Sequence, residues 1–166
     1  MSRSRTADTV LSRQGPSAQA GGGDAVSPTQ ISLSPTGKRK MKFNGREIAR
    51  AANPDPDHAV WHEITLYRRD RGGVVLALRK VCSDPPATDI VTVWRAGSAA
   101  EAMAELDAYD AGGDVPVGTD PEDPGLCPAE MAAAAEDLRA QVESCRHRFA
   151  GLRADLLEQV EASGRV

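Results

Sequence analysis

The chain has 166 residues, of which 40% are hydrophobic but only 4% aromatic, and its formal net charge is −4. This length predicts a single domain with an aliphatic core, and because no run of about 18 apolar residues occurs, we expect no transmembrane helix and no membrane partner. No apolar stretch follows the N-terminal arginines, which argues against a secretory signal. The three cysteines form no C-x-x-C pair, which indicates a reducing, cytoplasmic setting. The abundance of Ala, Gly, Arg and Asp is typical of a GC-rich bacterial genome.

Charge is distributed unevenly along the chain. Residues 1–50 contain nine Lys/Arg and three Asp/Glu, a net of +6, whereas residues 51–166 contain eleven and twenty-one, a net of −10. A basic arm on an acidic body favours either an electrostatic partner or a solubilising role. The densest basic run is suited to neutralising phosphates without reading sequence, so nucleic acid is one candidate partner. This run consists of Lys38, Arg39, Lys40 and Lys42.

The N-terminal segment 1–37 is rich in Ser, Gly and Pro and contains no aromatic residue. Such a segment buries too little apolar surface to offset the entropy of ordering it, so we predict a disordered tail. Ile31 and Leu33 alternate with serine, a pattern compatible with one short edge strand.

Residues 39–50 predict a β-hairpin, because Asn44 and Gly45 form an Asn-Gly pair between two strand-like arms. A two-residue loop sets Lys42 opposite Glu47 as a pair of opposite charges on one face. The apolar residues of the two arms then share the other face; they are Met41, Phe43 and Ile48.

Three further strands are expected between Val60 and Arg95, where β-branched and aromatic residues dominate and side chains alternate between two faces. The residues 70–73 supply a turn that tolerates positive φ, and two adjacent prolines mark a loop in residues 83–88. The aromatic residues of these strands would offer stacking surfaces to nucleic-acid bases if exposed, although core positions are the commoner role. They are Trp61, Tyr67 and Trp94.

A helix is predicted to begin after Ser98, which forms a capping box with Glu101, and to end near Ala111 before two glycines. Acidic residues between 107 and 123 lack the EF-hand spacing and indicate a solvated loop. A second, longer helix begins at Pro128. Its apolar residues recur at alternating steps of four and three, a heptad seam made of Met131, Ala135, Leu138, Val142, Cys145, Phe149, Leu152 and Leu156.

The long helix outreaches the expected sheet, since about 33 residues span roughly 50 Å and five strands only about 20–25 Å. The seam therefore either packs against a second chain or covers the chain's own sheet as part of the core. Gly151 lies within the helix and allows a kink there. We favour a partner helix, so the expected oligomerisation residues are Leu138, Val142, Phe149, Leu152 and Leu156.

Catalytic motifs are missing from the sequence. His62 and Glu63 are neighbours on a strand and point to opposite faces, so they cannot act as an acid–base pair. His58 lies near Asp55 and Asp57 in a loop, a set that could bind a metal but is more typical of a solvated loop. No Walker A, GxGxxG, GxSxG or HExxH motif occurs. We therefore expect no catalytic residue, no metal and no cofactor, and hence no enzyme.

The predicted fold is α+β, an antiparallel β-meander of about five strands followed by a short helix and a long C-terminal helix. Its expected parts are a disordered tail (1–37), the sheet with the short helix (38–112), an acidic loop (113–127) and the long helix (128–162). The leading functional hypothesis is a non-enzymatic bacterial interaction or accessory protein that self-associates through its C-terminal helix. One alternative is a nucleic-acid-associated regulatory or accessory protein that uses the basic arm. A second is a small-ligand-binding or enzymatic domain with His58 or His62 in a cleft.

Overall fold

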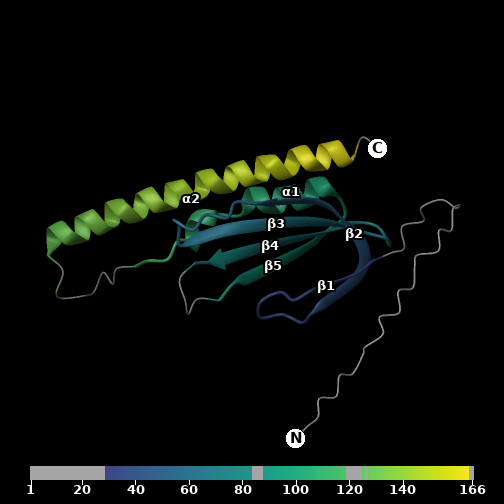
Figure 1. Cartoon of the computed structure of the whole chain (residues 1–166), viewed down its shortest axis with the longest axis horizontal. Helices are drawn as coiled ribbons and strands as arrows, with labels where there is room; N and C mark the ends of the chain where they lie inside the picture. The colour runs from purple at the N-terminus through teal and green to yellow at the C-terminus, as the bar shows by residue number, and fades with distance from the viewer. Residues whose placement is uncertain (1–28, 84–87, 119–124, 126, 165–166) are drawn as a thin grey trace, which may run out of the picture.

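The computed structural model describes residues 29–83, 88–118, 125 and 127–164. It confirms the predicted α+β fold, with a five-stranded antiparallel sheet in the order β1-β2-β3-β4-β5 and two helices over one face (Figure 1). Within the described ranges, no helix combines the length and apolarity needed to cross a membrane. The elements are β1 (Thr29–Leu33), β2 (Met41–Ala52), β3 (Val60–Arg69), β4 (Val74–Cys82), β5 (Ile90–Ala96), α1 (Ala99–Ala108), the 3₁₀ helix η1 (Ala111–Asp114) and α2 (Pro128–Ser163).

The predicted hairpin at Asn44-Gly45 is wrong, because β2 runs straight through both residues. The strand that precedes β2 is β1, where Ile31 pairs with Phe43. The turn between them contains Gly37, whose φ is +70°. The alternating pattern near Ile31 therefore did mark an edge strand, and this corrects the disordered tail expected through residue 37. Residues 1–28 lie outside the described part of the chain.

Gly45 has a different role from the one that its sequence context predicts. It pairs with Arg69 across β2 and β3, and a methyl group added there would overlap the carbonyl oxygen of Arg68. Glycine is therefore needed because two backbones approach closely, and not because a turn requires positive φ.

Gly45→Val should lower the free energy of unfolding by about 1–3 kcal/mol, because the side chain would force β2 away from β3. Denaturant unfolding followed by circular dichroism measures this change. Gly151→Ala is the control of opposite sign: an added Cβ meets no atom within 4 Å, and alanine in a helix should add about 1 kcal/mol. Equal stability of Gly45→Val and wild type would contradict the continuous β2.

The sheet curls so strongly that the connection after β1 reaches β5. The N–H of Thr36 donates to the carbonyl oxygen of Val91 at 2.9 Å, and the N–H of Val91 donates to Thr36 Oγ1 at 2.9 Å. Since β1 and β5 are the two edges of the sheet, these bonds partly close its face away from the helices. This explains why Val75 and Thr65, which point to that face by strand alternation, are only 0% and 7% exposed.

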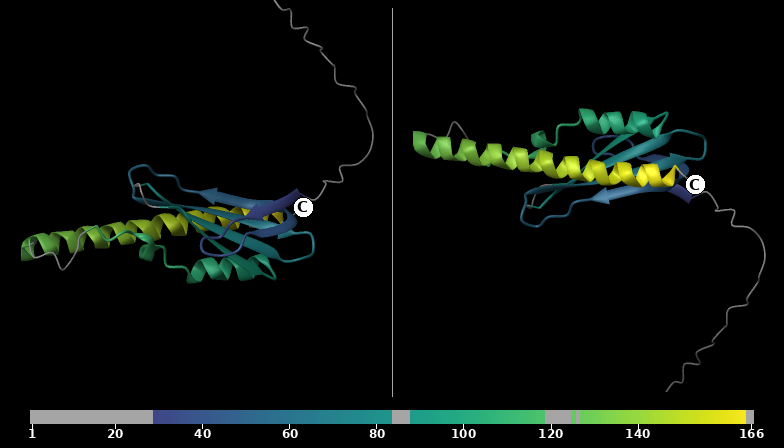
Figure 2. Two further views of the ribbon diagram at one scale, coloured as in Figure 1. Left: turned by 90° about the horizontal axis from the view of Figure 1, so that it is seen from below. Right: turned by 90° about the horizontal axis from the view of Figure 1, so that it is seen from above.

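The main core lies between the other face of the sheet and the helices. In this layer α1 covers β4 and β5, while α2 lies beside it over β2 and β3 (Figure 2). Ser98 caps α1 as predicted, accepting a hydrogen bond from the N–H of Glu101 at 3.2 Å. The helix ends at Ala108, three residues earlier than expected; Tyr109 and Asp110 are extended, and Ala111 begins η1.

The long helix α2 has 36 residues without a break at Gly151, which corresponds to roughly 54 Å. Its C-terminal half lies on the sheet, where Gln159 Oε1 accepts from the N–H of Arg50 at 3.0 Å and Ser163 Oγ donates to the carbonyl oxygen of Ile48 at 3.0 Å. Its N-terminal half extends past the end of the sheet (Figures 1 and 2). Residues 128–141 are called the projecting half below.

Candidate functional site

The heptad seam of α2 has two different surroundings. Phe149, Leu152 and Leu156 are 5%, 3% and 0% exposed in the chain's own core. They therefore cover the sheet and are unavailable to a second chain, which corrects the expectation that they join two copies. Val142 is half-buried beside Gly112. Of the expected oligomerisation residues, Leu138 alone belongs to the projecting half.

The projecting half borders an open apolar groove of about 610 Å³. Met131 is 42% exposed and Val117, on the facing loop, is 67% exposed. Exposed apolar side chains that gather in one place mark sites of association more often than scattered ones do. The groove is lined by Ala59, Pro116, Val117, Gly118, Met131, Ala134, Ala135, Asp137, Leu138 and Gln141.

The predicted basic run is exposed on the connection between β1 and β2 and on the start of β2. Lys38, Arg39, Lys40 and Lys42 form no ion pair with any residue that the structure describes. Further arginines adjoin it in the sheet, since Arg46 is the direct partner of Arg68. The basic surface is thus wider than the sequence run.

The charge separation also follows the fold. Residues 29–83, which form β1–β4, contain eleven Lys/Arg and five Asp/Glu, a net of +6. The described residues 88–118 contain one and six, a net of −5, and residues 127–164 contain four and seven, a net of −3. The first four strands are therefore basic, and the helical layer is acidic.

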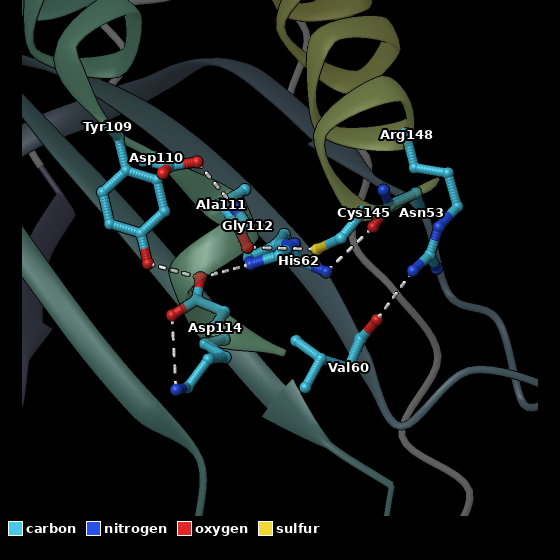
Figure 3. A network of polar contacts seen from close by, with 11 residues as sticks. Asn53, Val60, His62, Tyr109, Asp110, Ala111, Gly112, Asp114, Cys145 and Arg148 are labelled. Atoms are coloured by element: carbon cyan, nitrogen blue, oxygen red, sulfur yellow. Dashed lines mark hydrogen bonds and ion pairs between the residues drawn. The ribbon is translucent and has the colours of Figure 1, made fainter. Parts of the chain in front are cut away.

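A polar network is buried beneath α2, where β3 and β4 meet η1 (Figure 3). His62 is 1% exposed, and its Nε2–H donates to Asp114 Oδ2 at 2.8 Å. The hydroxyl of Tyr109 donates to the same oxygen at 2.5 Å. Lys80 Nζ lies 3.3 Å from the other oxygen, Asp114 Oδ1. One carboxylate therefore holds together three elements that are distant in sequence.

Electrostatics keep the Asp114 carboxylate ionised. Burial raises its pKa, but the hydrogen bonds from His62 and Tyr109 and the charge of Lys80 outweigh burial, so the pKa lies below its usual range. Burial, together with the bond to this carboxylate, raises the pKa of Tyr109. The network surrounds the buried Asp114 carboxylate with three partners from β3, β4 and the end of α1, so its role is to fasten η1 to the sheet.

His62 and Glu63 point to opposite faces as predicted. Glu63 forms ion pairs with Arg50 and Arg79 on the face away from the helices. The acidic residues after α1 are not simply a solvated loop, since Asp110 pairs with Arg146 at 2.9 Å and Asp114 lies in the buried network. Sequence reasoning missed Asp114; the one signal was the polar His62 on an otherwise apolar strand face. Asp120, Glu122 and Asp123 lie outside the described residues.

The predicted stacking surfaces are not assembled. Tyr67 packs edge-on against Phe43, with ring centroids 5.9 Å apart. Trp94 packs against Tyr109 at 6.3 Å on the helix side of the sheet. Trp61 is half-buried. Trp94 therefore packs at the edge of the core, whereas Trp61 and Tyr67 are half-buried on the other face of the sheet, so the three do not share one stacking surface.

A cavity of about 460 Å³ opens between the start of β3 and α2. It adjoins the apolar groove, with which it shares Ala59, Pro116 and Gln141. His58 lies at its edge, with Nδ1 2.7 Å from Asp55 Oδ2. Within the described residues, no group of three or more His, Cys, Asp or Glu is placed to hold a metal ion. Arg148 reaches into this cavity from α2. Its full lining is Pro56, Asp57, His58, Ala59, Val60, Ser83, Val115, Pro116, Gln141, Cys145 and Arg148.

Comparisons of the chain with protein-family models, curated proteins and solved structures each found no match.

Proposed function

We propose that this chain is a non-enzymatic interaction protein that self-associates in pairs through the projecting half of α2. One observation carries the proposal. The seam that covers the sheet in the C-terminal half of α2 continues past the end of the sheet, where Met131 is 42% exposed. Helices normally bury such a stripe against another element. A second copy supplies a matching stripe, because the same residues face it.

The partner helix runs antiparallel. Residues 145–156 of the seam already face the chain's own sheet, so a parallel partner would bring its sheet into the same space. An antiparallel partner places the second sheet at the opposite end. Because antiparallel coiled-coil helices set a positions against d positions, Leu138 then faces Ala135 of the second copy, and Met131 faces Val142 of the second copy.

The pairing is moderate in strength. Burial of each large apolar side chain contributes about 1.5–3 kcal/mol, and only Met131 and Leu138 are both large and free for this purpose in each copy. The small residues Ala134 and Ala135 allow the helices to approach closely. The proposal therefore describes a reversible dimer whose fraction rises with concentration.

Leu138→Glu should abolish dimerisation while leaving the fold intact, because a charge in the paired seam would have to be desolvated. Size-exclusion chromatography with light scattering measures the mass, and circular dichroism reports the fold. Leu157→Glu is the matched control: Leu157 lies on the same helix and is 44% exposed, away from the seam, so this variant should dimerise like wild type. Loss of pairing in both variants, or in neither, would contradict the proposal.

A second candidate function is association with nucleic acid through the basic strands. It is favoured by the charge separation, with a net of +6 on residues 29–83 against −5 and −3 on the other described ranges. Cations that pair with no acidic residue in the described part of the chain suit a flexible, negatively charged backbone. This surface lies on the connection after β1, away from the projecting half, so the two functions are compatible.

Replacing Lys38, Arg39, Lys40 and Lys42 by glutamine should flatten the salt dependence of nucleic-acid binding. Each phosphate that the variant no longer neutralises reduces the slope of log affinity against log salt by about one. Fluorescence anisotropy with a single-stranded oligonucleotide at several salt concentrations measures the slope. Arg139→Gln, on α2, is the control and should keep the wild-type slope. Wild-type protein that fails to bind at low salt would eliminate this candidate.

A further inference from the structure

Beside α2 lies a cavity that adjoins the apolar groove and shares Ala59, Pro116 and Gln141 with it. Its volume of about 460 Å³ is within the range of about 300–1,000 Å³ typical of small-molecule sites. One wall comes from the loop before β3 and the start of that strand, another from residues 115–116, and the third from α2. Val60, Val115 and Pro116 make part of this lining apolar, and Arg148 adds a cation.

The Arg148 side chain is held in place, but not all of its N–H groups have a hydrogen-bond acceptor. Its Nη2 donates to the carbonyl oxygen of Val60 at 3.4 Å (Figure 3), and its Nη1 lies 3.8 Å from Asp55 Oδ2. Nε and Nη1 are nevertheless buried without a hydrogen-bond partner among the described residues. Leaving a buried donor unsatisfied costs about 1–3 kcal/mol, and more for a charged group.

We propose that this cavity binds a small monocarboxylate with an apolar body, and that Arg148 receives its carboxylate. The guanidinium of Arg148, which lines the cavity, matches a carboxylate in charge and planar geometry. Val60, Val115 and Pro116 contact the apolar body. Gln141, which also lines the cavity, is placed to hydrogen-bond a polar substituent.

The charges around Arg148 favour a single negative charge over a phosphate. Asp55 lies near the guanidinium, and Asp57 lines the cavity. Two carboxylates at this position repel a dianion more strongly than a monoanion. His58 Nδ1 faces Asp55 Oδ2 at 2.7 Å, so this ring nitrogen is directed at a carboxylate of the chain itself. The site therefore selects a carboxylate and disfavours a phosphate monoester.

The test uses the full chain with benzoate, 3-methylbutanoate and hexanoate as probes, and with benzamide and inorganic phosphate as matched comparisons. Isothermal titration calorimetry and ¹⁵N NMR should show saturable binding of at least one carboxylate, with shifts at residues 58–60 and 115–116. Benzamide and phosphate should bind at least tenfold more weakly. No saturable carboxylate binding, or equal binding of benzamide, would overturn the proposal.

Variants separate the role of Arg148 from general charge. Arg148→Gln should weaken carboxylate binding at least tenfold, whereas Arg139→Gln, elsewhere on the same helix, should leave it unchanged. Asp55→Asn should tighten binding several-fold, since it removes the carboxylate nearest the guanidinium. Wild-type affinity in a folded Arg148→Gln protein would contradict the assignment. If Arg148→Gln does not fold, Asp55→Asn provides the test, and unchanged or weaker carboxylate binding in Asp55→Asn would contradict the assignment.

Discussion

Leu152→Glu should prevent the protein from folding. Leu152 lies on the face of α2 that packs on the sheet and is 3% exposed. Its replacement removes about 1.5–3 kcal/mol of stabilisation from apolar burial. It also forces an unpaired carboxylate into an apolar layer, which costs several kilocalories per mole more. Together these losses approach the roughly 5–15 kcal/mol by which a domain is stable. Circular dichroism and one-dimensional NMR should show no cooperative thermal transition.

The control for this variant is Leu157→Glu, which makes the same change five positions later. Leu157 is 44% exposed, so its variant should unfold within a few degrees of wild type, since surface substitutions usually change stability by less than about 0.5 kcal/mol. A cooperative transition in Leu152→Glu close to that of Leu157→Glu would show that the C-terminal half of α2 is not part of the core.

Asp114→Ala should lower the free energy of unfolding by about 3–5 kcal/mol, the cost typical of removing one member of a buried ion pair. It would remove the acceptor of both His62 and Tyr109 and the counter-charge of Lys80. Urea unfolding monitored by fluorescence measures the change. Asp114→Asn keeps one acceptor oxygen and should cost less than alanine. Equal stability of Asp114→Ala and wild type would mean that the network does not fasten η1.

The same carboxylate predicts how stability depends on pH. The pKa of Asp114 is lowered in the folded protein, so its contribution is present at neutral pH and is lost as the pH falls through the folded pKa. The pKa of Asp110 is lowered to about 2 by its hydrogen bonds to Arg146 and the N–H of Gly112. In Asp114→Asn the free energy of unfolding should therefore fall less steeply at acidic pH than in the wild type. The loss at the lowest pH, which arises from Asp110, should remain.

Local signals predicted the parts of the fold that are locally determined. The capping box at Ser98, the turn at residues 70–73 and the proline at the start of α2 each depend on a few neighbouring residues. The structure has all three. The strands β3 and β4 were equally clear, because their apolar pattern is long and periodic.

The hairpin prediction was wrong because a local signal competed with long-range pairing. Asn44-Gly45 has the composition of a tight turn, but β2 pairs with β1 on one side and β3 on the other through this region. The close approach of Arg68 that requires Gly45 comes from a strand whose position no local pattern predicts. Tertiary pairing therefore outweighed turn propensity.

The buried polar network and the cavity were harder to predict than the fold. Asp114 lies far in sequence from His62 and Lys80, and it stood among several acidic residues with nothing to distinguish it. Arg148 lies beside the apolar seam of α2, and only the fold turns it toward the cavity. The C-terminal part of the seam, from Cys145 to Leu156, does face the core, but a heptad pattern is the same whether it faces a sheet or a second helix.

The mass of the unmodified protein in solution tests self-association most directly. Sedimentation equilibrium at rising concentrations should give a weight-average mass that increases from 17.6 kDa, the mass of one chain, toward twice that value. The increase should fit one monomer–dimer equilibrium. A mass of one chain at every concentration up to the solubility limit would contradict the proposed pairing through the projecting half of α2.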